Sequence, residues 1–163
     1  MNVNNMLTAI DIMNRAGKFD ISVWQEVVPG GYKDTECELH RCGTSACFAG
    51  WVAVSPEFRK DGGSISRSCG YPIITDGNNN RLYEASAIAY WLDIPNRDAE
   101  DLCFVGSNIG RFYNDKEYDE ITTDDVVCVL ATLLLEHAGD DTYCFDSNDP
   151  NVLDGDDDGV GMA

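Results

Sequence analysis

The segment from residue 121 to 139 constrains the fold most, because its signals agree on one helix. Thr122 is a good N-cap. Asp125 is at the third helical position, where a carboxylate can accept a hydrogen bond from the backbone N–H of the N-cap residue. Gly139 is a natural helix stop. Apolar residues recur on one face, at Val127, Leu130, Leu133 and Leu134. A helix with one apolar face buries it against other elements, so this segment favours a helical fold.

Other segments share the helical spacing of apolar residues or carry helix-start signals. We expect helices at residues 3–16, 46–54 and 82–92, with Thr44 or Ser45 as the cap of the second and Pro56 as its end. In the first, the residues at helical spacing are Met6, Leu7, Ile10, Met13 and Ala16. Pro95 and Asn96 restart the chain into a further short helix, in which Ala99, Leu102 and Cys103 face inward. The class is therefore mainly α, with about five helices. YPIIT, DGNNN and RLY, from Tyr71 to Tyr83, read as one small β-hairpin with a five-residue loop, which would make the fold α+β. Residues 19–28 fit either a short helix or an irregular apolar loop.

Composition divides the chain into two parts. We expect residues 1–139 to form a single compact domain. Residues 140–163 contain no basic residue and are expected to be a flexible acidic tail and a candidate binding segment. Its aspartates are Asp140, Asp141, Asp146, Asp149, Asp154, Asp156, Asp157 and Asp158.

Charge limits the classes of partner. The chain has 29 acidic and 11 basic residues, a formal net charge of −18. Phosphate contacts need Lys and Arg, so direct binding of nucleic acid is excluded, as is an anionic membrane surface. No apolar run approaches the roughly 20 residues of a membrane span. The charge permits a basic partner, and it also fits simple solubility.

Cysteine usage favours a reducing compartment. There are seven cysteines, an odd number, in a spacing unlike that of a small disulfide scaffold. Met1 to Asn5 contain no basic n-region and no apolar run, so we expect no signal peptide. Free thiols in a cytoplasm follow from both observations.

Four residues have the chemistry of zinc ligands. Cys37, His40, Cys42 and Cys47 are spaced C-x2-H-x-C-x4-C, which is not a usual finger or ribbon pattern, and Cys69 is a distant fifth candidate. We favour no metal and no cofactor: Cys47 is read as a small core residue and the others as incidental thiols.

Cysteine catalysis is a second reading of the same segment. Cys47 falls in the first turn of the expected helix, where the helix dipole lowers a thiol pKa. CGTSAC faintly resembles the CGSCW segment of papain-like proteases. His40 and His137 are the two histidines that could serve as base. We expect no enzyme, and keep a cysteine- or zinc-dependent enzyme centred on Cys37 to Cys47 as the alternative.

The tail contains one calcium-like pattern. Asp154, Asp156, Asp158 and Gly159 match D-x-D-x-D-G, the opening of an EF-hand loop. The loop also needs a bidentate glutamate at its twelfth position, and no glutamate follows Asp158. We therefore favour a solvated acidic tail over a calcium site.

The segment CGTSACFAGW, from Cys42 to Trp51, resembles a recurring stretch in small proteins encoded by bacteriophages. FDISVW, from Phe19 to Trp24, is similar to the F-D-M-x-x-W stretch that precedes it in those proteins. The resemblance covers residues 19 to about 104. It implies a viral origin and a life in the cytoplasm of an infected bacterium. That family has no established activity, so we expect a structural motif made by Cys42, Gly43, Thr44, Cys47, Gly50 and Trp51.

Charge and resemblance together lead to one functional expectation. The chain is expected to be a phage-encoded inhibitor that binds a bacterial host protein during host takeover or against host defence. It would occupy a basic, nucleic-acid-binding surface as a DNA mimic. A structural or regulatory phage protein without a host target is the second alternative.

Overall fold

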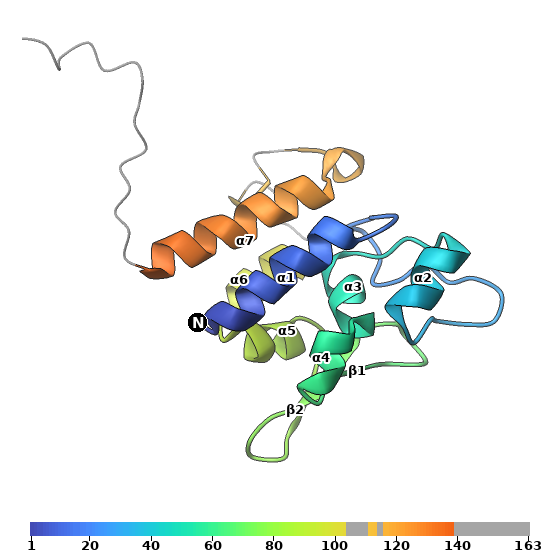
Figure 1. The fold of residues 1–163 in the computed structure, drawn as a ribbon, viewed down its shortest axis with the longest axis horizontal. Helices are drawn as coiled ribbons and strands as arrows, with labels where there is room; N and C mark the ends of the chain where they lie inside the picture. The colour runs from blue at the N-terminus through green and yellow to red at the C-terminus, as the bar shows by residue number, and fades with distance from the viewer. Residues whose placement is uncertain (104–110, 114–115, 139–163) are drawn as a thin grey trace, which may run out of the picture.

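The computed structural model describes residues 1–103, 111–113 and 116–138, and it is mainly α with a small antiparallel sheet, as predicted (Figure 1). Seven α-helices lie in this part of the chain. The elements are α1 Val3–Arg15, α2 Glu36–Cys42, α3 Phe48–Val54, α4 Pro56–Lys60, β1 Ser64–Ile65, β2 Pro72–Thr75, β3 Arg81–Tyr83, α5 Glu84–Leu92, α6 Asn96–Cys103, the 3-10 helix η2 Tyr118–Glu120, and α7 Thr123–Ala138.

Helix α3 lies at the centre of the core. All seven of its residues are buried, because α1, α4, α5, α6 and the sheet all contact it. A helix that is apolar all round has no face for solvent, so this central place follows from its sequence.

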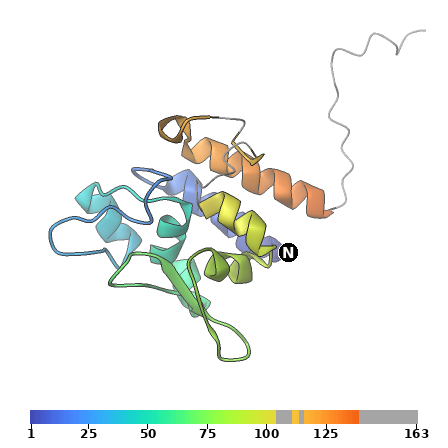
Figure 2. The ribbon, with the colours of Figure 1, turned by 180° about the vertical axis from the view of Figure 1, so that it is seen from behind.

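The pair α1 and α7 forms one side of the molecule, and the two helices run antiparallel (Figures 1 and 2). Both predicted helices are confirmed, but the residues that each one buries differ in part from those that the apolar spacing indicated. In α7 the buried residues are Val126, Val129, Leu130 and Leu133, while Val127 and Leu134 are only partly buried. In α1 they are Met6, Ala9, Ile12 and Met13, and Leu7 is 52% exposed.

The hairpin is confirmed. Strands β2 and β3 pair antiparallel with Ile74 opposite Leu82, and a five-residue loop joins them. Asp76 holds that loop, since its carboxylate accepts hydrogen bonds from the backbone N–H groups of Asn78 and Asn80. Strand β1, which the sequence did not predict, pairs with β2 as a third strand.

Two short helices were missed, although their caps are in the sequence. The Thr35 hydroxyl accepts a hydrogen bond from the Glu38 N–H at the start of α2, and Gly43 ends that helix at φ 61°. The Ser55 hydroxyl accepts one from Phe58 at the start of α4, where Pro56 is the first residue. Pro56 therefore begins a helix, directly after α3 ends.

The predicted cap of α3 was wrong. Helix α3 starts at Phe48 with Cys47 as its N-cap residue, and not with Thr44 or Ser45. Ala46 is extended instead, because it bridges to Phe19 and Gln25. Residues 20–35 are largely irregular, in agreement with the loop alternative for 19–28. The predicted tail, 140–163, lies outside the described residues.

Candidate functional site

The two motif segments lie side by side and form one structural joint. Ala46 makes a parallel bridge to Phe19 and an antiparallel bridge to Gln25. The Cys47 N–H donates to the Val23 carbonyl at 2.9 Å, and the Glu26 N–H donates to the Ser45 carbonyl at 2.8 Å. Residues 19–26 thus clasp the chain directly before α3.

Gly50 is the point of closest approach in this joint. A Cβ atom on Gly50 would lie 1.7 Å from the carbonyl oxygen of Trp24 and 2.9 Å from the Cβ of Ala46. Ala46 and Ala53 are fully buried. Small residues at positions 46, 50 and 53 therefore serve close packing.

Trp51 anchors the other end of the motif. Its ring is buried, and its indole N–H donates to the Lys18 carbonyl at 3.1 Å. The ring of His40 packs against it with centroids 4.9 Å apart and the ring planes inclined by 48°. His40 is thus a packing partner of α3, and its Nε2 lies 3.7 Å from a carboxylate oxygen of Glu36.

Three motif residues, Cys42, Gly43 and Thr44, lie at the end of α2 and directly after it. Gly43 takes the left-handed conformation that ends α2, and Cys42 is exposed. Thr44 is 1% exposed, and its hydroxyl has no hydrogen-bond partner among the described residues. A buried hydroxyl without a partner costs free energy, so Thr44 lowers the stability of the fold.

The four zinc candidates point to different surroundings. Cys37 and Cys42 are exposed, whereas Cys47 is buried with its Sγ 3.9 Å from the Trp24 carbonyl oxygen. Among the described residues, no three or more His, Cys, Asp or Glu side chains gather as a metal site would require.

The thiol of Cys47 has the wrong environment for a nucleophile. Burial raises its pKa to about 11, although backbone N–H groups at the start of α3 act to lower it. A thiolate at neutral pH would need the opposite shift. Burial also raises the pKa of Cys103. Of the two histidines, His137 lies in the last turn of α7, and the ring of His40 lies against Trp51.

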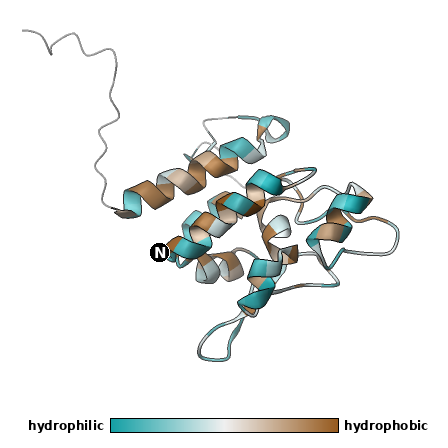
Figure 3. Cartoon of the chain, viewed as in Figure 1, coloured by the Kyte–Doolittle hydropathy of each residue, from teal (hydrophilic) through white to brown (hydrophobic). Residues whose placement is uncertain are grey.

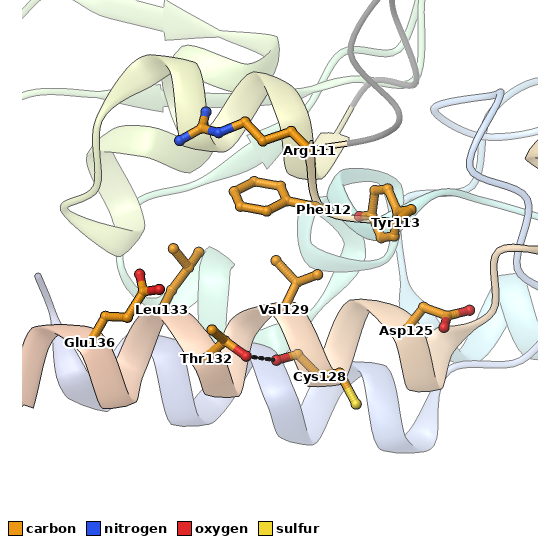
Figure 4. A pocket seen from close by; sticks show the side chains of 9 residues that line it. All are labelled: Arg111, Phe112, Tyr113, Asp125, Cys128, Val129, Thr132, Leu133 and Glu136. Atoms are coloured by element: carbon orange, nitrogen blue, oxygen red, sulfur yellow. Dashed lines mark hydrogen bonds between the residues drawn. The ribbon is translucent and has the colours of Figure 1, made fainter. Parts of the chain in front are cut away.

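The described surface has several hollows, and two of them concern the candidate residues and helix α7. One, of about 540 Å³, is lined by Cys37, His40, Val54, Pro56 and Arg59, among others. The other, of about 430 Å³, lies between the segment around Phe112 and one flank of α7 (Figure 4).

Polar groups that line the hollow of Figure 4 are paired with other groups of the chain. In the one that Figure 4 draws, the Arg111 guanidinium is paired with Asp98 at 2.7 Å and with Asp101. The Tyr113 hydroxyl donates to the Leu102 carbonyl, and burial raises the pKa of that phenol. These groups hold α6 against the chain.

Acidity is strongly concentrated in one part of the sequence. Residues 1–92 contain ten acidic and eight basic residues, whereas residues 93–163 contain nineteen acidic and three basic, so −16 of the −18 lies after Leu92. In the described part this acidity falls on α6, η2 and α7. Its exposed carboxylates include Glu100, Glu117, Asp119, Glu120, Asp124 and Glu136.

The predicted tail, residues 140–163, contributes only −8 of the −18. A count by halves of the chain would have revealed the imbalance. The tail aspartates, and with them the calcium candidates Asp154, Asp156 and Asp158, lie outside the described residues. Within the described ranges, no helix is both long and apolar enough to cross a membrane.

Comparisons with protein-family models, with curated proteins and with solved structures found no match for this chain.

Proposed function

We propose that this chain is a phage-encoded protein that binds and inhibits a bacterial host protein through a basic surface of that protein. The single observation that supports the proposal is the charge imbalance, with a net −16 after Leu92. Fields of opposite sign speed the encounter of two proteins and favour the correct partner.

Mimicry of a nucleic acid is the form of inhibition that this charge fits. B-DNA carries one charge per roughly 1.7 Å of its axis, so 16 charges correspond to about 27 Å of duplex. The described residues after Leu92 contain ten acidic and three basic side chains, so they carry −7 of this charge. Direct binding of nucleic acid is not part of the proposal.

The test begins with capture of the partner from a bacterial lysate and continues with its association kinetics. We expect the on-rate to fall about tenfold or more between 0.05 and 0.5 M salt, while the off-rate changes less, because screening acts on the encounter. A partner that normally holds DNA or RNA should release it when this protein is added.

Matched charge variants locate the binding charge. The triple variant Glu100→Gln/Asp119→Asn/Glu136→Gln removes three exposed charges after Leu92, and the control Asp61→Asn/Glu26→Gln/Glu84→Gln removes three exposed charges before it. We expect the first to slow association severalfold and the second to leave it nearly unchanged. A captured partner with a neutral or acidic contact surface, bound independently of salt, would defeat the proposal.

A further inference from the structure

An uncharged apolar strip runs along the outer side of α1 and α7. We call it the α1/α7 seam, and it comprises Val3, Leu7, Ile10, Val127, Leu134 and Leu135. Leu7 and Leu135 are each 52% exposed and Val3 is 44% exposed. The other three are partly buried against the core. Figure 3 shows hydrophobic stretches on both helices on the side that faces the viewer.

On each of the two helices, the flank that lies away from the seam residues is identified by its contacts. On α1 that flank is occupied: the Asn5 amide donates to the Trp91 carbonyl at 2.8 Å, and Arg15 binds Glu36 and Glu57. On α7 it carries Thr132 and faces the hollow of Figure 4. The remaining flanks therefore meet each other, and residues spaced three or four apart line them.

The seam avoids charge in a protein that is otherwise rich in it. Residues 1–10 contain no charged side chain, and neither do residues 126–135, which lie alongside them because the two helices are antiparallel. Charged side chains are found at both ends of the seam. Asp124 is exposed at one end, as is Asp11, which is paired with Arg15, and Glu136 is exposed at the other.

We propose that the α1/α7 seam binds an amphipathic helix of a partner protein, with an apolar stripe flanked by Lys and Arg. The apolar side chains of the seam would receive the stripe, and the carboxylates at its ends would pair with the basic flanks, as in other helix-in-groove complexes. The inference rests on the proposed function only for the basic character of the partner. A second copy of this chain fits the seam less well, because it would bring the same acidic ends together.

The probe for this test is a synthetic 18-residue peptide of leucine and lysine, with leucine at helical spacing. Its twin carries glutamate in place of every lysine. Binding is measured by fluorescence anisotropy at 0.15 M salt, and circular dichroism confirms that each variant is folded. We expect the lysine peptide to bind and its glutamate twin to bind at least tenfold more weakly.

Matched variants of the protein test the seam itself. Leu7→Ser/Leu135→Ser should weaken binding of the lysine peptide at least tenfold. The control Val27→Ser/Tyr90→Ser changes two side chains of 67% and 46% exposure outside the seam, and it should change binding less than twofold. Equal binding to both double variants, or equal binding of the two peptides, would overturn the inference.

Two further outcomes separate this inference from the proposed function. If light scattering finds a wild-type dimer that Leu7→Ser/Leu135→Ser converts to a monomer, the seam is a self-interface and the inference fails. If the charge variants slow capture of the host partner while the seam variant binds it like the wild type, the proposed function stands and the seam proposal falls.

Discussion

At the scale of single residues, the motif from Cys42 to Trp51 is explained by packing. Gly50 admits the Trp24 carbonyl, Ala46 bridges two backbone segments, and the Trp51 indole is bonded to Lys18. Each contact joins the motif to residues 18–25. The FDISVW and CGTSACFAGW segments therefore form one structural unit in this chain.

Gly50→Ala tests the closest of these contacts. The added methyl group would stand 1.7 Å from a backbone oxygen, so the clasp around α3 has to move. We expect a loss of about 1–3 kcal/mol or more in the free energy of unfolding, measured by urea denaturation. Gly77→Ala is the control, because nothing lies within 4 Å of its Cβ position. Equal urea midpoints for the two variants would show that the backbone around Gly50 accommodates a methyl group without loss of stability.

Thiol titration tests the redox state of the cysteines. Cys37, Cys42, Cys69 and Cys128 are exposed, and Cys47 and Cys103 are buried. In native protein a thiol reagent should modify the four exposed groups quickly and the two buried ones slowly, because access and thiolate formation are both restricted by burial. In denaturant without reductant it should find nearly all of the seven cysteines in the sequence. About one reactive group, with three disulfides by mass spectrometry, would refute free thiols.

The raised pKa of Cys47 makes stability depend on alkaline pH. Between the ordinary thiol value of 9.0 and about 11, the unfolded chain loses a proton that the folded chain keeps. Stability is therefore fully present below pH 9 and falls as pH rises. At pH 10.5 the loss from this group is on the order of 2 kcal/mol. Urea midpoints at pH 8 and 10.5 should differ less for Cys47→Ala than for the wild type.

At the scale of elements, short helices depend on their caps and on ion pairs to neighbours. Helix α2 has seven residues and one buried side chain, Leu39. Arg15 of α1 binds Glu36 of α2 at 2.8 Å and Glu57 of α4 at 2.7 Å, and the hydrogen bond to Glu36 raises the pKa of Arg15. One guanidinium thus ties three helices together.

Thr35→Ala tests the cap of α2. It removes the hydroxyl that accepts from the Glu38 N–H, so we expect a loss of about 0.5–2 kcal/mol in stability. Hydrogen exchange should become faster at the amides of α2 before those of α3. Thr8→Ala, inside α1, is the matched control and should cost less. Unchanged exchange in α2 would mean that packing alone holds this helix.

At the scale of the whole molecule, the charge imbalance acts on stability as well as on binding. Like charges crowded into α6, η2, α7 and the acidic residues beyond them repel one another. Their repulsion is long-ranged at low salt, where the Debye length is about 30 Å at 0.01 M, and short-ranged at 1 M, where it is about 3 Å.

Added salt should therefore stabilise this protein. We expect the melting temperature to rise by several degrees between 0.01 and 0.5 M sodium chloride, as measured by scanning calorimetry. The rise should be smaller for Glu100→Gln/Asp119→Asn/Glu136→Gln than for the control Asp61→Asn/Glu26→Gln/Glu84→Gln. A melting temperature that falls with salt would show that attractive ion pairs, such as those of Arg15, outweigh the repulsion.

Sequence alone determined the elements whose signals are local. Helix α7 was predicted from its caps and spacing, and α6 was predicted with Ala99, Leu102 and Cys103 facing inward, where they are buried. The hairpin from β2 to β3 followed from its turn residues. Helices α2 and α4 were missed because seven and five residues are too few for periodicity to appear, although their caps could have revealed them.

Tertiary structure alone decided which face of each helix is buried and what the small residues contact. Periodicity finds an apolar stripe, but its neighbours fix the angle at which a helix sits, and so Leu7 is exposed while Ala9 is buried. The role of Gly50 depends on a carbonyl 26 positions earlier in the chain. The α1/α7 seam likewise exists only because two segments more than 110 residues apart pack together. Contacts between distant segments depend on how all elements bury their surfaces at once, and no local pattern records that.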